Sequence, residues 1–165
     1  MKNPTVEMKI RNYGTLKIEL YPDKAPETVK NFLGLVNGGF YGGLIFHRVI
    51  SGFMIQGGGF DENFRDKKCP SIFGEFAANG FKQNDVKHER GVISMARTSV
   101  PDSASSQFFI MHRSSPHLDG QYAAFGKVTE GMDVVDRIAS VPTGTRGWYS
   151  DVPKESVVIE YCREI

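Results

Sequence analysis

The stretch Phe46-His47-Arg48-Val49-Ile50-Ser51-Gly52-Phe53-Met54-Ile55-Gln56 is the part of the chain that decides both the fold and the site. It indicates two short apolar strands joined at Gly52, yet it also carries Arg48 and Gln56. Side chains in a strand alternate between two faces, so Met54 and Gln56 share a face. Arginine and glutamine are seldom buried, and we expect both at the surface beside exposed apolar side chains. A few polar groups on an apolar floor are typical of a ligand-binding surface.

Strand-like runs recur along the rest of the chain. Residues 16–20, Leu-Lys-Ile-Glu-Leu, alternate apolar and polar side chains as a half-buried strand does. The pattern predicts eight strands in all, at residues 6–10, 16–20, 44–49, 53–56, 92–96, 108–112, 123–128 and 157–162. Between Gly57 and Gly91 the pattern is mostly loop, and a loop of that length in a compact domain is usually functional or disordered.

Two segments change to helical spacing. Pro26 stands at the start of the first and Gly38 at its end, which are typical helix start and stop residues. Asp133 early and Arg137 late suit the dipole of the second. The apolar residues that recur every three or four positions are Val29, Phe32, Leu33 and Val36 in the first segment, and Met132, Val135, Ile138 and Ala139 in the second.

Eight short strands and two helices fit a closed barrel, because closure removes exposed sheet edges. The predicted fold is therefore mainly β, a closed eight-stranded antiparallel barrel capped by two α-helices, in a single domain that spans residues 1–165. Side chains fill the interior of such a barrel, so a ligand would bind on its outer wall. A β-sandwich has the same composition, and periodicity does not choose between the two.

The composition excludes several classes of partner. With 24% charged residues and a formal net charge of +1, the chain lacks the clustered Lys and Arg that nucleic acid binding needs. No apolar segment is long enough to span a membrane, and the first residues lack the apolar stretch of a secretory signal. Cys69 and Cys162 do not make a disulfide framework, so we expect free thiols in a reducing cytoplasm.

Familiar catalytic patterns are also missing. Gly57-Gly58-Gly59 follows a strand, but neither a helix start nor a Lys-Ser/Thr pair comes after it, which argues against a phosphate loop. Only His112 and His117 lie close together among the histidines, and their spacing fits one face of neither a strand nor a helix. We therefore expect no metal. No Gly-x-Ser-x-Gly motif or comparable context indicates a hydrolase.

A second informative stretch is Ser-Ser-Gln-Phe-Phe-Ile-Met at residues 105–111, followed by residues 116–128. Phe108 and Phe109 are adjacent, so in a strand they place one ring on each side of the sheet. In isolation both rings would be core residues, and Arg48 would be an ordinary surface charge. The two stretches together favour a binding site.

Four motifs in these regions closely resemble those of the cyclophilins, and they occur in the same order. The resemblance runs across nearly the whole chain and includes Ala-Pro-x-Thr-Val-x-Asn-Phe at residues 25–32. It implies an eight-stranded antiparallel barrel capped by two helices, peptidyl-prolyl cis-trans isomerase activity and no cofactor. The four motifs are Phe-His-Arg-Val-Ile-x-Gly-Phe-Met-Ile-Gln-Gly-Gly (46–58), Gly-Val-Ile-Ser-Met-Ala (91–96), Ser-Gln-Phe-Phe-Ile (106–110) and Leu-Asp-Gly-x-x-Ala-Ala-Phe-Gly-Lys-Val (118–128).

The resemblance also implies a proline site, position by position. Arg48 and Gln56 would be the catalytic residues. The implied partners are proline-containing peptides and unfolded or folding proteins, with neither nucleic acid nor membrane, and we expect a cytoplasmic monomer. The implied substrate-binding residues are Phe53, Met54, Ala96, Arg97, Gln107, Phe109, His117, Leu118 and Tyr122.

Isomerisation about the bond before proline breaks no bond, which fits the missing nucleophile and metal. Resonance holds the imide planar, so uncatalysed exchange takes about tens to hundreds of seconds. Twisting leaves the prolyl nitrogen pyramidal with a lone pair, and a nearby guanidinium stabilises that form more than either planar form. We expect Arg48 to act in this way and Gln56 to orient it. Four side chains would hold the proline ring: Phe53, Met54, Phe109 and Leu118.

A proline-peptide-binding module or chaperone with incidental catalysis is the alternative. The presence of Arg48, Phe53, Gln56 and Phe109 together favours the enzyme. A protease-coupled assay on a short proline peptide separates the two, because the enzyme gives fast exchange and the module gives tight binding without exchange.

Three departures from the cyclophilin pattern change the expected site. His117 stands where eukaryotic members commonly have tryptophan, and Tyr122 where many have histidine. Arg97 occupies a position that is commonly asparagine, and Asp-Lys-Lys-Cys at residues 66–69 replaces a glycine-rich stretch beside a second pocket. We therefore expect that pocket to be more charged and the preference for the residue before proline to differ.

We predict that cyclosporin binds with weakened affinity while isomerase activity is kept. The imidazole of His117 offers less flat area than indole and replaces its fixed N–H donor with a titratable group. The family resemblance implies that cyclosporin binding depends on contact with that indole. An inhibition assay beside a tryptophan-bearing member tests this, and comparable submicromolar inhibition would contradict it.

Overall fold

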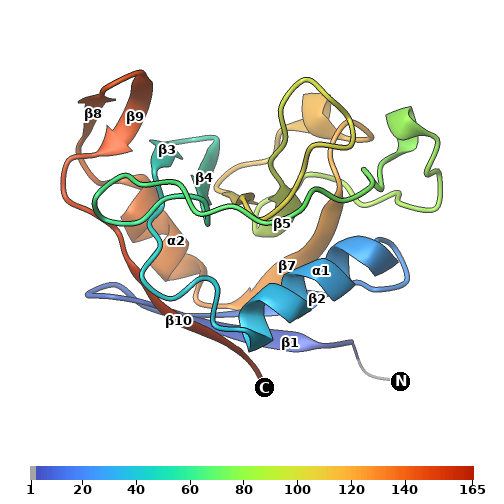
Figure 1. Ribbon diagram of the computed structural model, residues 1–165, viewed down its shortest axis with the longest axis horizontal. Helices are drawn as coiled ribbons and strands as arrows, with labels where there is room; N and C mark the ends of the chain where they lie inside the picture. Colours follow the sequence, from blue (N-terminus) through green and yellow to red (C-terminus); the bar gives the residue numbers. More distant parts are fainter. Residues whose placement is uncertain (1–2) are drawn as a thin grey trace.

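One curled antiparallel sheet dominates the protein, whose computed structural model describes residues 3–165 (Figure 1). Eight strands lie in the order β10-β1-β2-β7-β5-β6-β4-β3, and all of their pairings are antiparallel. This confirms the prediction of a mainly β fold with eight strands in one antiparallel sheet. Their bounds are β1 (Thr5–Ile10), β2 (Gly14–Leu20), β3 (Arg48–Ile50), β4 (Met54–Gly57), β5 (Val92–Met95), β6 (Phe108–Met111), β7 (Ala124–Glu130) and β10 (Ile159–Glu164).

The two edge strands of the sheet, β3 and β10, do not pair with each other within residues 3–165. The segment that precedes β3 does meet the beginning of β10 and the residues just before it. The Ile159 amide donates to the Leu44 carbonyl at 2.8 Å, and the Phe46 amide donates to the Val157 carbonyl at 3.0 Å. The eight-stranded antiparallel sheet is thus as predicted, whereas complete closure into a barrel is not confirmed.

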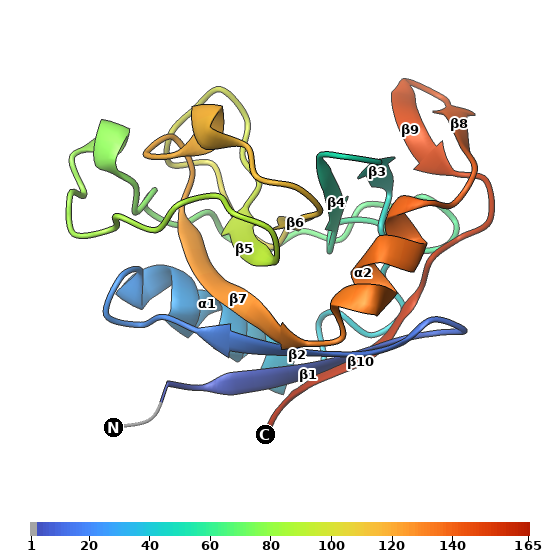
Figure 2. The same cartoon turned by 180° about the vertical axis from the view of Figure 1, so that it is seen from behind.

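Two α-helices pack on the sheet, at the segments where helical spacing predicts them. α1 (Pro26–Asn37) contacts β10, and α2 (Met132–Ala139) contacts β2, β3 and β4. The opposite views in Figures 1 and 2 show that the helices occupy different parts of the curled sheet. Their apolar stripes supply the buried side chains of Val29, Phe32, Val36, Val135, Ile138 and Ala139.

Two local predictions need correction. The sequence pattern missed a separate hairpin of β8 (Thr143–Arg146) and β9 (Tyr149–Pro153), because only Val152 and Pro153 of its strand residues are buried and no apolar alternation marks it. The strand predicted at 44–49 begins only at Arg48, since Leu44 and Ile45 form isolated bridges. The long segment between β4 and β5 is mostly loop, as predicted, with the short 3-10 helix η1 (Ala77–Asn79).

Alternation in β6 separates the core from a second apolar cluster. The ring of Phe108 is fully buried inside the curled sheet, where Phe46 and Tyr41 meet it edge-on. Phe109 points to the opposite face and belongs to a cluster with Met54. The sequence prediction of one ring on each side of the sheet is confirmed. The second cluster therefore lies on the outer wall, where a ligand can reach its edge.

A buried acid from the long loop stabilises the start of α1. The N-cap residue is Ala25, whose side chain cannot accept a hydrogen bond. The Glu75 carboxylate takes this role: it accepts from the Thr28 amide at 2.6 Å, from the Thr28 hydroxyl at 2.7 Å and from the Glu27 amide at 3.2 Å. A negative charge is favourable at a helix N-terminus, so Glu75 joins the loop to the helix electrostatically.

We predict that Glu75→Ala lowers the free energy of unfolding by about 3 kcal/mol, because it leaves buried donors of Thr28 without an acceptor. Urea denaturation followed by circular dichroism measures the change. Glu27→Ala, on the exposed side of the same helical turn, is the control and should cost less than about 1 kcal/mol. Equal effects of the two substitutions would show that the buried cap has no special role.

Candidate active site

The β3–β4 hairpin presents the predicted catalytic pair on its outer face. Arg48 and Gln56 are cross-strand partners, and the Arg48 guanidinium donates to the Gln56 side-chain oxygen at 3.3 Å. The Gln56 amide group then donates to the side-chain oxygen of Gln107 at 3.0 Å. Gln107 immediately precedes β6, so a third segment of the chain helps to fix the direction of the guanidinium.

A pocket of about 140 Å³ lies beside this pair. Its floor is apolar, because Met54, Phe109 and Leu118 are almost completely buried beneath it. The structure thus brings nine of the eleven predicted site residues together. The lining consists of Arg48, Phe53, Met54, Gln56, Ala96, Arg97, Phe109, Leu118 and Tyr122.

The other two predicted residues lie at the margin. Gln107 contacts the site through its hydrogen bond to Gln56. His117, in the short 3-10 helix η2 (Pro116–Leu118), lies with its ring centroid 6.1 Å from that of Phe53, tilted by 32°. Arg48 lines the same pocket as Phe53 and Phe109, as its proposed role requires.

Arg97 holds one wall of the pocket in place. Its guanidinium lies 4.7 Å from the ring centres of both Phe76 and Tyr122, and it donates to the Gln121 carbonyl at 2.7 Å. Cation–π contacts of this kind fix the orientation of an aromatic ring. The edge of the Tyr122 ring in turn packs on Phe109, with centroids 5.6 Å apart.

A larger depression of about 410 Å³ adjoins the pocket and shares Gln56, Ala96 and Arg97 with it. The run 66–69, which we expected to flank a second pocket, lies along this depression. The ammonium group of Lys67 is held by Phe40: it donates to the Phe40 carbonyl at 2.8 Å and lies over the Phe40 ring. Lys68 pairs with Asp66 at 3.4 Å.

Behind the floor lies a Ser–His–Asp arrangement that sequence reasoning missed, with the serine and the histidine buried. His88 contacts the Ser94 hydroxyl at 2.9 Å and the Asp119 carboxylate at 3.2 Å, and its ring stacks near Phe109. Burial lowers the pKa of His88, against the raising effect of Asp119. Ser94 is 0% exposed, so no substrate reaches its hydroxyl. The three residues come from separate segments, and no sequence spacing links them.

Among residues 3–165 there is no group of three His, Cys, Asp or Glu side chains placed to hold a metal ion. Over the same residues, no helix has both the length and the apolar character needed to cross a membrane.

Comparisons with known proteins agree on one family. The family model described as cyclophilin type peptidyl-prolyl cis-trans isomerase matches residues 5–164. A peptidyl-prolyl cis-trans isomerase of Acinetobacter baylyi is 50% identical over 164 residues, covering 96% of this chain and 84% of the relative. Peptidyl-prolyl cis-trans isomerase B of Escherichia coli is 48% identical over 157 residues, covering 90% and 93%.

Solved structures lead to the same result. A Cryptosporidium parvum cyclophilin type peptidyl-prolyl cis-trans isomerase superposes with a TM-score of 0.81 and 31% identity, covering 99% of this chain and 98% of that one. A crystal structure of the same isomerase in the presence of the dipeptide Ala-Pro gives a TM-score of 0.79. The chain belongs to the cyclophilin-type peptidyl-prolyl cis-trans isomerases.

His47, next to Arg48 in sequence, makes stability depend on pH. It is 3% exposed among aromatic rings, and within residues 3–165 its Nδ1 atom has no hydrogen-bond partner. Burial and, secondly, the charge of Arg48 lower the pKa of His47 from 6.5 to about 4. Between these two pKa values, His47 therefore binds a proton in the unfolded chain but not in the folded chain. As a result, the free energy of unfolding decreases as pH falls through that window.

We predict that the free energy of unfolding of the wild type drops by about 3 kcal/mol more than that of His47→Phe between pH 7 and pH 4. Phenylalanine keeps an aromatic ring among its neighbours and cannot titrate. Urea titrations of both proteins at the two pH values measure the difference. Parallel losses in the two proteins would rule out His47 as the cause.

Proposed function

We propose that this protein catalyses rotation about X-Pro imide bonds, without a covalent intermediate, by electrostatic stabilisation of the twisted imide by Arg48. The observation that carries this proposal is a hydrogen-bonded guanidinium at the rim of a small apolar pocket. The pocket of Phe53, Met54, Phe109 and Leu118 suits a pyrrolidine ring, which has no charge and no donor of its own once it is in a peptide.

Holding the ring anchors one side of the rotating bond. The peptide chain before the proline then rotates, and the prolyl nitrogen gains a lone pair as conjugation is lost. A guanidinium aimed at that nitrogen favours the twisted geometry over both planar ones, and only such a difference lowers the barrier. The contacts from Arg48 through Gln56 to Gln107 support this role, because they hold the guanidinium in position before the substrate binds.

The charge of Arg48 is free to act on the substrate. Among residues 3–165, no carboxylate lies within ion-pair distance of its guanidinium. Lysine would be a weaker substitute, since its ammonium group lacks the rigid planar donors of a guanidinium. Gln56 also keeps its position to hydrogen-bond a substrate carbonyl or a water molecule.

We also propose that the substrates are proline-containing peptides and folding proteins, and that the protein works as a single-domain cytoplasmic monomer. The Ala-Pro dipeptide used with the Cryptosporidium parvum isomerase supports a proline ligand. Two free cysteines support a reducing compartment. Burial raises the pKa of the Cys162 thiol far above its usual value, so it stays an unreactive apolar group. Weakened cyclosporin binding remains part of the proposal because of His117.

We predict that Arg48→Ala lowers kcat/KM at least about 100-fold, the effect of removing one stabilising donor from a transition state. Arg48→Lys should retain an intermediate rate because it keeps the charge without the fork. A protease-coupled assay on a short proline peptide measures both. Because Arg48 is exposed, the circular dichroism spectrum should not change.

Arg11→Ala is the matched control. Arg11 is an exposed arginine paired with Glu62 and Glu160, and it lines no part of the pocket. Its loss should leave turnover unchanged. Near-normal turnover of the Arg48→Ala protein would refute the assigned role, and tight peptide binding without exchange in the wild type would favour a binding module instead.

A further inference from the structure

The turn between β3 and β4 connects the catalytic arginine to the pocket floor. The Phe53 amide donates to the Ile50 carbonyl at 3.0 Å, which closes a four-residue turn. Gly52 occupies its third position with a φ of +80°, a left-handed conformation that glycine adopts readily. In such a turn the amide of the third residue is not used by the turn itself. The Gly52 N–H therefore needs an acceptor from elsewhere.

His112 supplies that acceptor. It follows β6 directly, and its ring atom Nδ1 accepts a hydrogen bond from the Gly52 amide at 2.9 Å. Its own backbone amide donates to the Phe53 carbonyl at 2.9 Å. One residue thus binds the turn on both sides of the peptide that leads into the pocket.

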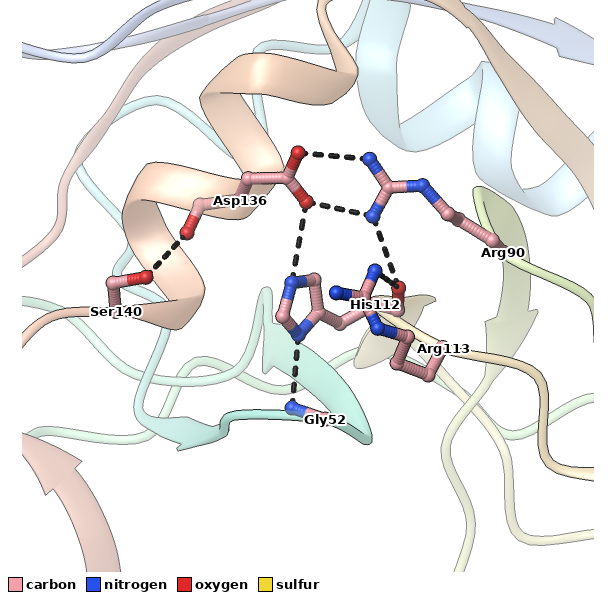
Figure 3. Close-up of polar contacts among 6 residues, drawn as sticks. All are labelled: Gly52, Arg90, His112, Arg113, Asp136 and Ser140. Atoms are coloured by element: carbon pink, nitrogen blue, oxygen red, sulfur yellow. Dashed lines mark hydrogen bonds and ion pairs between the residues drawn. The ribbon is translucent and has the colours of Figure 1, made fainter.

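The opposite edge of the His112 ring reaches α2 (Figure 3). Its Nε2 atom lies 3.2 Å from the Asp136 carboxylate. Arg90 holds both oxygens of that carboxylate, at 2.7 and 2.8 Å, and also donates to the His112 carbonyl at 3.1 Å. The carboxylate therefore has a fixed position, and it fixes the ring that bridges α2 to the turn.

These contacts determine where the ring carries its proton. A backbone N–H can only donate, so Nδ1 must offer its lone pair to Gly52. Nε2 then carries the hydrogen and donates to Asp136, which is an acceptor when ionised. His112 is consequently neutral, with the proton on Nε2. A second proton, on Nδ1, would place one N–H donor against another, that of Gly52. The hydrogen bond between the ring and the turn would then be lost.

We propose that His112 is a positioning residue of the proline pocket: as the Nε2–H imidazole, it bridges Asp136 to the Gly52 amide and thereby holds Phe53 in the pocket that Arg48 also lines. The inference rests on the proposed function, because it concerns the same pocket. The proposal adds His112, which does not line the pocket, to the residues that shape it. It also adds a contact from α2 that affects the pocket only through the turn.

The charges around the ring define its response to pH. Burial, the charge of Arg113 and, more weakly, Arg90 lower the pKa of His112 from 6.5, whereas Asp136 raises it. The turn itself contributes no titratable group. The bridge is therefore intact at neutral pH, and it is lost as pH falls through that lowered pKa. Turnover should decline over the same range.

Asparagine and leucine have similar shapes but differ in whether they offer a hydrogen-bond acceptor. Substituting each for His112 therefore tests the acceptor apart from the volume of the side chain. Asparagine can place its side-chain oxygen where Nδ1 lies, so His112→Asn keeps the bond to Gly52 and cannot titrate. His112→Leu removes the acceptor and leaves the Gly52 amide unpaired. We expect kcat/KM to fall about tenfold in His112→Leu and less than about threefold in His112→Asn at neutral pH.

NMR exchange spectroscopy on a proline peptide measures turnover without a coupling protease, so the pH can be varied. The acid decline should be steeper in the wild type than in His112→Asn. Ser140→Ala is the control, because Ser140 bonds only the Asp136 carbonyl in Figure 3 and should leave turnover unchanged. Equal turnover of the leucine and asparagine variants would overturn the proposal.

Nitrogen-15 shifts of the His112 ring in the wild type give a test that needs neither catalysis nor a variant. Unprotonated Nδ1 and protonated Nε2 at neutral pH support the bridge, and the reverse tautomer overturns it even if His112→Leu fails to fold. Absence of turnover in the wild type would instead refute the proposed function, while the ring nitrogens would still report on the bridge.

Discussion

Strand alternation is the constraint on which the site depends. In β6, Phe108 fills the interior of the curled sheet while its neighbour Phe109 forms the pocket floor. In β4, Ile55 points inward while Met54 and Gln56 point outward. Because one backbone carries both sets of side chains, the packing of the core fixes the spacing of the pocket. The proposed chemistry depends on this spacing, since it consists of holding a proline ring and placing a charge beside it.

Polar contacts from distant segments complete the geometry that the strands begin. Gln107 orients Gln56, Arg97 lies between two rings, and His112 receives the turn amide. A single hydrogen bond adds little net stability, but a buried group left without its partner costs considerably more. Such contacts therefore select one arrangement of the pocket. Burial also lowers the pKa of both His47 and His88, so the two imidazoles are largely uncharged at neutral pH.

Most of the fold could be predicted from local pattern. Period-two alternation located the strands of the main sheet. The apolar stripe that includes Phe32, with Pro26 at its start, located α1. The sequence pattern did not predict the β8–β9 hairpin, because few of its side chains are buried and they do not alternate between apolar and polar. The eleven site residues came mainly from the family resemblance, since alternation alone reached only the outward face of residues 48–56. The residues behind the site, including Ser94 and Asp136, gave no signal.

The sequence by itself determined the two helices and most of the strands, which faces they bury, and that Arg48 and Gln56 share a hairpin with apolar side chains. These properties are periodic, so neighbouring residues contain all of the information. Only the tertiary structure decided that Gln107 orients Gln56, that Glu75 caps a helix 47 positions away and that His112 joins α2 to the turn. Such pairs have no fixed spacing, because the folding of the whole sheet brings them together.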